Sequence, residues 1–336
     1  MGKINVDEIK NEIVRYGKAN PMALQPAILS REIMLNRYAK PLGKVKGKWT
    51  IPYILFGNVV QAFSDKWTPY GEVQFAKKVA KNFHQKVNFP INPYDVYGSW
   101  VEDLYEEEKK PADMPISKYI VDMVRKQIIS DLDTLSISGK FDSAQVGTTT
   151  PEYGKSMDGL NKVVDEMVSD TENPVFFIPV DASLANSPVD RVTAYEKNLP
   201  TKGNISNIFI SLEEFYEYVE QRETPSDKYI DFNDPQRGKT KFGRNIVGVP
   251  GLKKGRIVSF YDGNLFRLYD RKDNPATIDD VQVQDYIVKL FSQWHLGYDF
   301  AINQYCFVET ADAAKNRGLN NAEQNKLFYP NQYGLN

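Results

Sequence analysis

The sequence predicts an α+β protein in which one long helix is combined with strands that lie far apart along the chain. The helix is indicated by the stretch 115–140, where apolar residues recur at helical spacing. Strands are indicated by the aromatic-rich stretch 51–98 and by two alternating segments, 285–294 and 298–309, around Leu296-Gly297. A chain of 336 residues exceeds the usual size of a single hydrophobic core, so two lobes are expected.

The long helix is predicted to span 115–138, which is about 23 residues or roughly 35 Å at 1.5 Å per residue. Its expected apolar stripe consists of Ile116, Tyr119, Ile120, Met123, Val124, Ile128, Leu132 and Leu135. Lys118 lies on the opposite, polar side. Asp113 is expected to cap the start, and Gly139 is expected to end the helix in a left-handed conformation. Such a pattern is typical of a helix that packs along a core.

Residues 1–50 are expected to form an extended arm. Prolines interrupt a short amphipathic helix at 1–18 and a second helical piece at 27–39, and a stretch rich in lysine, glycine and proline follows at 40–52. A pattern broken in this way buries little apolar surface by itself. The arm is therefore expected to need another surface to lie on.

Two clusters of opposite charge come before the long helix. The basic cluster consists of Lys77, Lys78, Lys81 and Lys86, in a stretch whose partial alternation predicts a hairpin. The acidic segment consists of Glu102, Asp103, Glu106, Glu107 and Glu108. One interpretation is that both clusters are solvated faces. The other is that the hairpin docks on an acidic surface of a partner.

Short helices and strands alternate after the long helix. Helices are predicted at 160–168, 189–197 and 212–223, and strands at 173–180, 205–210, 245–249, 256–261 and 265–269. Ser211 is placed to cap a helix, with Glu214 at the capping-box position. The tripeptide Asp262-Gly263-Asn264 predicts a tight hairpin between the last two strands. The polar stretch 224–244 has the length of a functional or mobile loop.

Composition excludes several classes of function. The net charge of −2 and the pI near 5.9 argue against tight binding to nucleic acid, which normally requires a basic surface, and give no reason to expect binding to an anionic membrane. The single cysteine, Cys306, excludes an intramolecular disulfide. There is no apolar signal core and no apolar run of membrane-spanning length.

No motif for catalysis or cofactor binding is present. The two histidines, His84 and His295, are far apart in the sequence, and neither lies in the context of a nucleophile motif. Phosphate-binding glycine motifs and metal-ligand spacings are absent, and the glycine-rich stretch 248–255 predicts a turn. The carboxylates at 102–108 fit a solvated helix face better than an acid–base pair. No catalytic residue, cofactor or metal is therefore expected.

The order of the elements resembles that of the major capsid proteins of tailed bacteriophages, which have the HK97 fold. The stretches that carry this resemblance are the long helix ending at Gly139, MDGL at 157–160, IVGVPGL at 246–252, YDGNLFRLYD at 261–270 and the closing strands at 285–309. The resemblance covers nearly the whole chain.

The resemblance implies a division into five parts. These are an N-terminal arm at 1–50, an E-loop region at 51–96, a peripheral domain at 97–182 with a spine helix at 115–138, an axial domain at 183–285, and a return to the peripheral domain with a C-terminal tail at 286–336. The loop at 224–244 is then expected near the symmetry axis of the capsomer.

The resemblance also implies a function and partners. The chain would assemble into hexamers and pentamers of an icosahedral phage head that encloses double-stranded DNA, and it would contact that DNA weakly and non-specifically. A scaffolding protein, a portal and a maturation protease are implied as partners. Because the chain starts directly at the arm, a separate scaffolding protein is expected. Assembly in the host cytoplasm, incorporation into the virion and no membrane contact complete the expectation.

Some members of that family crosslink an E-loop lysine to an asparagine of a neighbouring subunit. Lys66, Lys77, Lys78 and Lys81 lie in the corresponding stretch. Nothing in the sequence marks a buried lysine–asparagine pair beside a carboxylate, so crosslinking is not expected.

Two other functions remain open from the sequence. An encapsulin-type nanocompartment shell would share the fold and would hold a cargo enzyme in place of DNA. A soluble hydrolase that uses Asp and Glu on an aromatic-rich scaffold would be monomeric and would turn over a substrate.

Overall fold

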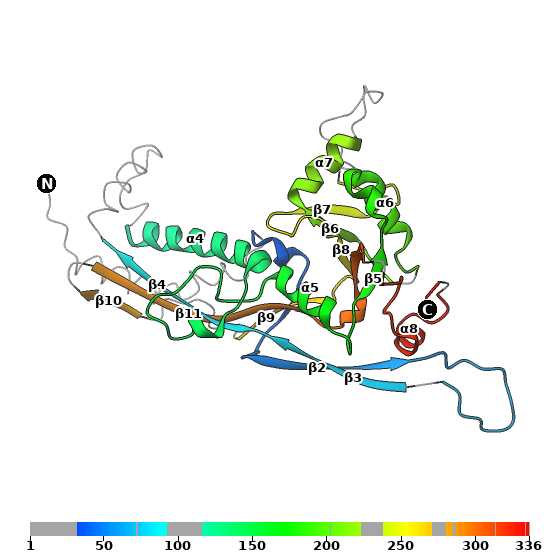
Figure 1. Ribbon diagram of the computed structural model, residues 1–336. Helices are drawn as coiled ribbons and strands as arrows, with labels where there is room; N and C mark the ends of the chain where they lie inside the picture. Colours follow the sequence, from blue (N-terminus) through cyan, green and yellow to red (C-terminus); the bar gives the residue numbers. More distant parts are fainter. Residues whose placement is uncertain are drawn as a thin grey trace. The chain divides into compact units, whose positions relative to one another are not determined.

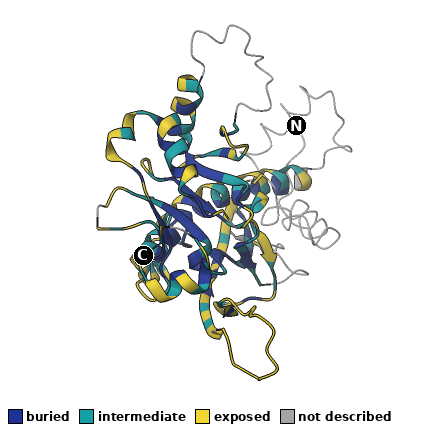
Figure 2. Ribbon diagram, turned by 90° about the vertical axis from the view of Figure 1, so that its right-hand side faces the viewer, coloured by how far each residue is buried: buried dark blue, intermediate teal, exposed yellow. Residues whose placement is uncertain are grey.

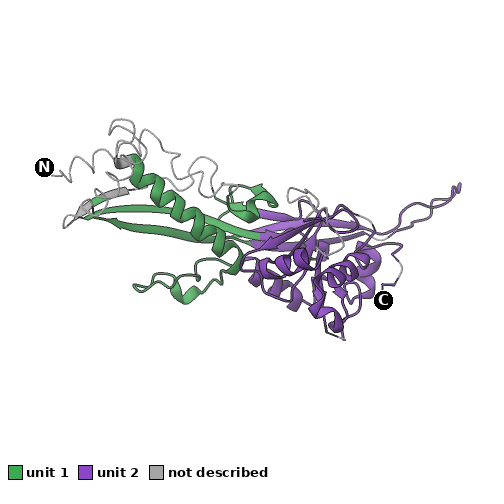
Figure 3. Cartoon of the chain, turned by 90° about the horizontal axis from the view of Figure 1, so that it is seen from above, with its two compact units in different colours: residues 1–48, 81–158, 267–298 green, residues 49–80, 159–266, 299–336 purple. Residues whose placement is uncertain are grey.

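The computed structural model describes residues 32–71, 73–92, 116–201, 203–222, 238–270, 280–284, 287–312, 314–332 and 334–335 (Figure 1). The chain forms two compact units, each built from segments distant in sequence (Figure 3). Unit 1 contains 1–48, 81–158 and 267–298, and unit 2 contains 49–80, 159–266 and 299–336. None of the described helices is long and apolar enough to cross a membrane.

A five-stranded sheet and the long helix α4 characterise unit 1. Its elements are η1 (Met34–Arg37), β1 (Lys40–Leu42), β4 (Phe83–Ile91), α4 (Ile116–Ser138), η2 (Ser143–Gln145), β9 (Leu265–Tyr269), β10 (Asp280–Gln284) and β11 (Ile287–Phe300), of which β9 and β11 continue across the unit boundary. The strand order is β1-β9-β11-β10, and β4 pairs antiparallel with β11 from Val288–Ile91 to Leu296–Phe83.

The predicted long helix is confirmed as α4. The buried residues on it are Ile120, Val121, Val124, Ile128, Ile129, Leu132, Leu135, Ser136 and Ile137. The prediction that Met123 belongs to the stripe was wrong, because its side chain is 49% exposed. The buried stripe is rotated toward Val121 and Ile129, and at 3.6 residues per turn this rotation leaves Met123 on the solvent side. The expected cap, Asp113, lies outside the described residues.

Gly139 follows α4, but not for the predicted reason. It is not among the residues with positive φ, so it does not adopt a left-handed conformation. A Cβ at this position would lie 2.6 Å from the carbonyl oxygens of both Leu135 and Met157. Glycine is therefore needed because two backbone segments approach each other closely here.

The described part of the predicted arm is packed. Ile33, Leu35 and Val45 are buried, and the Val45 N–H donates to the carbonyl of Tyr269 at 3.0 Å. The expected second helical piece at 27–39 is, in its described part, a single 3₁₀ turn, η1. In residues 32–48, the three buried apolar side chains anchor the described part of the expected arm within unit 1. Residues 1–31 lie outside the described residues.

A mixed five-stranded sheet with the order β5-β12-β8-β6-β7 forms the centre of unit 2. The elements of unit 2 are β2 (Lys48–Phe56), β3 (Val73–Lys81), α5 (Leu160–Ser169), β5 (Phe176–Pro179), η3 (Ala182–Asn186), α6 (Pro188–Lys197), β6 (Asn207–Ser211), α7 (Leu212–Arg222), β7 (Asn245–Val249), β8 (Val258–Phe260), η4 (Asn303–Tyr305), β12 (Cys306–Thr310) and α8 (Ala322–Phe328). β5 runs parallel to β12, although some 130 residues separate them. Helix α7 packs against β6 and β7, and α6 packs against α7.

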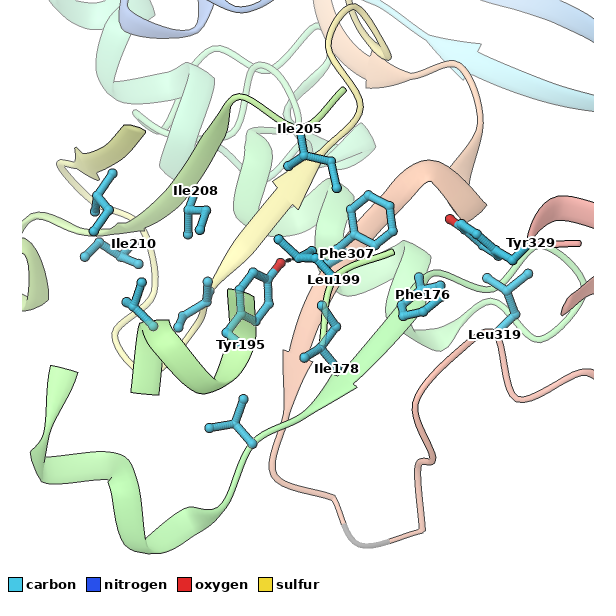
Figure 4. Packing of buried hydrophobic residues seen from close by; sticks show 14 of the residues in the cluster. Phe176, Ile178, Tyr195, Leu199, Ile205, Ile208, Ile210, Phe307, Leu319 and Tyr329 are labelled. Atoms are coloured by element: carbon cyan, nitrogen blue, oxygen red, sulfur yellow. Dashed lines mark hydrogen bonds between the residues drawn. The ribbon is translucent and has the colours of Figure 1, made fainter. Parts of the chain in front are cut away.

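An aromatic cluster fills the core of unit 2 (Figure 4). Phe176 contacts Phe307 and Tyr329 at ring-centroid distances of 5.3 and 4.8 Å. Tyr195 is completely buried, and its hydroxyl donates to the Phe307 carbonyl at 2.9 Å and lies 2.8 Å from Ser259 Oγ. Burial raises the pKa of Tyr195 well above its usual value, so the hydroxyl stays protonated and able to donate.

The predicted tight hairpin at Asp262-Gly263-Asn264 was wrong in its strand pairing. A turn is present, because the Asn264 N–H donates to the Tyr261 carbonyl at 3.0 Å and Gly263 has a φ of +83°. However, β8 pairs with β12 and β6, whereas β9 pairs with β1 and β11. The Asn264 side chain donates to the Ile302 carbonyl at 2.9 Å and accepts from the Ile302 N–H at 3.0 Å, which ties the turn to the residue before η4.

The two closing segments expected around Gly297 also differ from the prediction. Strand β11 continues through Gly297 to Phe300, and β12 follows after the short turn η4. A Cβ at position 297 would lie 2.5 Å from the Lys81 carbonyl oxygen and 2.8 Å from the Asn82 Cα. This glycine therefore admits a neighbouring backbone and does not break the strand.

The predicted cap of α7 is present in a modified form. The Glu214 N–H donates to Ser211 Oγ at 3.2 Å, and Ser211 Oγ donates to Glu214 Oε2 at 2.9 Å. The glutamate thus accepts from the serine hydroxyl, where a standard capping box uses the backbone N–H. The pairing closes the first turn of α7.

We expect Leu132→Asp to prevent folding, because the Leu132 side chain is 2% exposed and a buried unpaired carboxylate costs several kcal/mol. The free energies of unfolding of Met123→Asp and Lys118→Asp should lie within about 0.5 kcal/mol of the wild-type value, because substitutions at exposed positions usually change stability little. Soluble yield and urea unfolding measure this. Equal failure of Met123→Asp and Leu132→Asp would contradict the assigned orientation of α4.

Candidate assembly surface

The described residues contain no set of side chains arranged for metal binding. No group of three or more His, Cys, Asp or Glu residues among them could hold a metal ion. Cys306 is completely buried, and burial strongly raises the pKa of its thiol, so it is not a reactive thiolate.

A buried cluster of Arg191, Glu214 and Glu309 is the closest approach to an acid–base pair. Arg191 Nη1 donates to Glu214 at 2.5 Å, and Nε donates to Glu309 at 2.6 Å. Burial raises the pKa of Glu309, and Arg191 opposes this rise. Burial alone would lower the pKa of Arg191, but the two carboxylates raise it overall. The guanidinium bridges both carboxylates, so the cluster ties α6, α7 and β12 together and leaves no carboxylate poised for acid–base chemistry.

A pocket of about 540 Å³ opens beside the base of the β2–β3 connection. It is lined by Gly57, Asn58, Tyr70, Gly71, Ala322, Asn325, Lys326, Leu327, Tyr329, Pro330, Asn331, Gln332 and Leu335. None of these residues carries a carboxylate, so the pocket holds no acid–base pair of the kind that a hydrolase uses.

The most exposed apolar surface of the described chain lies on the hairpin of β2 and β3. These strands form a separate two-stranded sheet, joined by residues 57–72 (Figure 1). Its inner face is held by unit 2: Leu55 belongs to the core cluster, and Tyr53 packs against that cluster. Because strand side chains alternate between two faces, the neighbouring residues point to the outer face.

The outer face of the hairpin and the connection after β2 are apolar and exposed (Figure 2). The outer-face residues, with their exposed fractions, are Ile54 (50%), Phe56 (58%), Val73 (52%), Phe75 (77%) and Val79 (42%). The residues of the connection are Val59 (53%), Val60 (88%), Phe63 (94%), Trp67 (89%) and Tyr70 (57%). We call these ten residues the hairpin patch. Exposed apolar side chains gathered on one hairpin in this way mark an interaction site.

The predicted basic cluster is divided between two strands, and the hairpin expected for this stretch was wrong, because β3 pairs with β2 whereas β4 pairs with β11. Lys77 and Lys81 are exposed on β3, and Lys86 is exposed on β4. Lys78 differs from the prediction, because its ammonium contacts Asp299 at 2.6 Å and both side chains are only 12% exposed. Strand alternation places the adjacent residues Lys77 and Lys78 on opposite faces, so one is solvated and the other is held within unit 2.

The acidic segment of the predicted contact lies outside the part of the chain that the structure describes. It consists of Glu102, Asp103, Glu106, Glu107 and Glu108. Docking of the exposed lysines on this segment therefore stays a prediction.

The hairpin patch was not predicted from the sequence, although β2 carries a signal for it. The strand reads KWTIPYILF, with apolar residues on both of its faces. A two-sided apolar strand is normally buried on both sides. In a two-stranded hairpin with one face on the core, that pattern indicates a second, external contact.

Comparison with known proteins was made by sequence and by structure. No family model and no curated protein matches this sequence. By structure, the chain is similar to a chain of the satellite phage P4 procapsid, with a TM-score of 0.50 and 12% sequence identity over 86% of this chain and 98% of the other. The chain has the HK97-like fold. The α+β architecture predicted from the sequence is thereby confirmed.

Two further structures resemble this HK97-like chain less well. A virus-like particle from Pyrococcus furiosus has a TM-score of 0.47 at 10% identity, covering 86% of this chain and 96% of the other. The capsid of a native GTA particle has a TM-score of 0.49 at 9% identity, covering 83% and 89%. Both scores fall below 0.5, so the fold assignment rests on the P4 procapsid chain.

We expect Lys78→Met to destabilise the protein by roughly 1.5–3 kcal/mol, because it removes a hydrogen bond to a charged group and leaves Asp299 buried without its cation. Lys77→Met is the matched control and should change stability by less than about 0.5 kcal/mol. Urea unfolding measures both variants, and Lys78→Met combined with Asp299→Leu should recover part of the loss. Equal midpoints for the two single variants would contradict the assigned faces.

Proposed function

We propose that this protein is a major capsid protein, a structural subunit that self-assembles into the icosahedral head of a bacteriophage. The observation that carries the proposal is the hairpin patch, which the described part of the chain leaves uncovered. Burying a large apolar side chain is worth about 1.5–3 kcal/mol. A patch of ten such residues therefore favours association with another surface.

A second copy of this chain is the partner that best fits the patch. The HK97-like fold and the P4 procapsid likeness support a shell subunit. The patch lies on a hairpin and need not contact the same patch of another subunit. It therefore suits a heterologous contact, in which the hairpin of each subunit lies on a different surface of the next subunit. Such contacts form rings when the rotation between neighbours closes, and rings are the arrangement of hexamers and pentamers.

The role is structural and not enzymatic. Among the described residues, Arg191 compensates Glu214 and Glu309, Arg244 pairs with Glu196, Lys78 pairs with Asp299, and the pocket is lined without carboxylates. These observations leave the hydrolase alternative without a site in that part of the chain.

The proposed role implies what the shell encloses, which proteins assist its assembly and where the axial part of the subunit lies. Double-stranded DNA is enclosed and contacted weakly, because a net charge of −2 does not clamp phosphates. A scaffolding protein, a portal and a maturation protease act with it during assembly in the host cytoplasm, and the product is part of the virion. Residues 183–285 form the axial part, with the 224–244 loop near the capsomer axis.

Electron microscopy of the expressed protein, with and without its scaffolding protein, tests this proposal. Closed shells of hexamers and pentamers are expected. Shells that contain a cargo enzyme would favour the nanocompartment alternative, and a stable monomer under all conditions would overturn the proposal.

We expect Phe63→Ser and Trp67→Ser to leave the subunit folded, because both side chains are about nine-tenths exposed, at 94% and 89%. Each variant should raise the critical concentration for assembly by roughly tenfold or more, since burial of such a side chain contributes about 1.5–3 kcal/mol. Tyr153→Ser is the matched control, as Tyr153 is 65% exposed and lies outside the hairpin patch. Light scattering against concentration measures assembly. An unchanged critical concentration for both hairpin variants would show that the patch is not the contact.

The exposed lysines are proposed to guide the same contact. Lys77, Lys81 and Lys86 dock on the acidic segment 102–108 of a neighbouring subunit, and each exposed pair contributes only about 0–1 kcal/mol. Reversing all three lysines to Glu should leave the subunit folded and slow assembly, and high salt should slow the wild type in the same way. Light scattering across a salt series tests this. Unchanged assembly of the triple variant, without salt dependence of the wild type, would favour solvated clusters.

A further inference from the structure

The two histidines of the chain, far apart in sequence, meet in unit 1. His84 on β4 and His295 on β11 are directly opposite each other in the antiparallel register. Their rings are stacked, with centroids 4.4 Å apart and planes within 3° of parallel. Only the pair Leu296–Phe83 follows them, so the stack lies next to the end of the β4–β11 ladder.

The groups around the stack differ for the two rings. His84 is exposed, and its Nε2 lies 3.1 Å from Gln293 Oε1 on β11. His295 is partly buried, and its Nδ1 lies 3.4 Å from a carboxylate oxygen of Asp270, directly after β9, without forming a hydrogen bond. Lys46, in the segment after β1, adds a positive charge near His295, and it is exposed.

These surroundings can stabilise one protonated ring but not two protonated rings together. Burial lowers the pKa of His295, and the charges of His84 and Lys46 lower it further, whereas Asp270 raises it. One carboxylate can balance one imidazolium. A second imidazolium would put two like charges face to face at directly opposite positions of the ladder, which destabilises strand pairing.

We propose that the His84–His295 stack is an acid-sensitive latch on the β4–β11 strand pair. While at most one of the two rings is protonated, the stack is closed and the ladder extends to Leu296–Phe83. When both rings are protonated, they repel each other and the end of the ladder opens. The latch does not depend on the proposed capsid function, because it concerns pairing within one chain.

The direction of the pH dependence follows from the lowered pKa of His295. A histidine whose pKa is lower in the folded than in the unfolded state binds fewer protons when folded. The stability it contributes is fully present above the ordinary histidine pKa of about 6.5 and is lost as the pH falls through the lower, folded value. The opening of the ladder is therefore expected on the acidic side of pH 6.5.

Nuclear magnetic resonance of histidine-labelled protein tests the coupling directly, because the chain contains just two histidines. In the wild type, the His295 pKa should lie below the ordinary histidine value, because burial and nearby positive charge lower it. In His84→Gln, the His295 pKa should rise above its wild-type value, since a like charge is removed. In Asp270→Asn, the His295 pKa should fall, since the balancing carboxylate is removed. A His295 titration that is the same in the wild type and in His84→Gln would overturn the proposal.

Hydrogen exchange of the β4 and β11 amides tests the opening. Between about pH 7.5 and about pH 5, on either side of the histidine pKa, wild-type protection near Phe83 and Leu296 should fall by roughly tenfold after correction for intrinsic rates. His84→Phe keeps an aromatic ring but cannot be charged, so it should retain its protection at the lower pH. His84 is exposed, and this variant is therefore expected to fold. Equal loss of protection in the wild type and in His84→Phe would show that the stack is not the latch.

Discussion

The burial of Arg191 between Glu214 and Glu309 is the interaction on which the organisation of unit 2 depends. It joins the neighbouring helices α6 and α7 to β12, which lies more than 80 residues later in the chain. A buried ion that loses its partner costs about 3–5 kcal/mol, which is a large part of the 5–15 kcal/mol by which a typical domain is stable. With β12 fixed, the sheet β5-β12-β8-β6-β7 has its order, and the sheet in turn provides the core on which the β2–β3 hairpin rests.

The sequence predicted where elements occur better than how they pair. The bounds of α4, β7 and β9 were close to those observed, because helical periodicity and strand alternation are local properties. The exposure of Met123 and the separation of β8 from β9 were not predictable in this way, since they depend on which surface each element meets. Gly139 and Gly297 were identified as important positions, but close approach of a distant backbone leaves the same sequence signal as a turn.

The candidate surface was predicted only in part. The lysines drew attention to the hairpin because charge clusters are visible in a sequence, yet strand alternation divides Lys77 from Lys78. The apolar residues beside them were used only as a sign of strands. Apolar side chains normally fill a core, and a sequence alone does not tell which apolar face will lack a partner within its own chain. The structure makes that distinction, because Leu55 is buried while Phe56, the next residue, is 58% exposed.

The division of the two units has a consequence for synthesis. The chain passes from one unit to the other at residues 48/49, 80/81, 158/159, 266/267 and 298/299, so no continuous fragment corresponds to either unit. The central sheet of unit 2 is incomplete until β12, at Cys306–Thr310, has left the ribosome. The apolar hairpin, completed near residue 81, emerges long before the core that supports it. The exposed apolar hairpin is therefore present on the nascent chain before its core can form, which favours aggregation during translation.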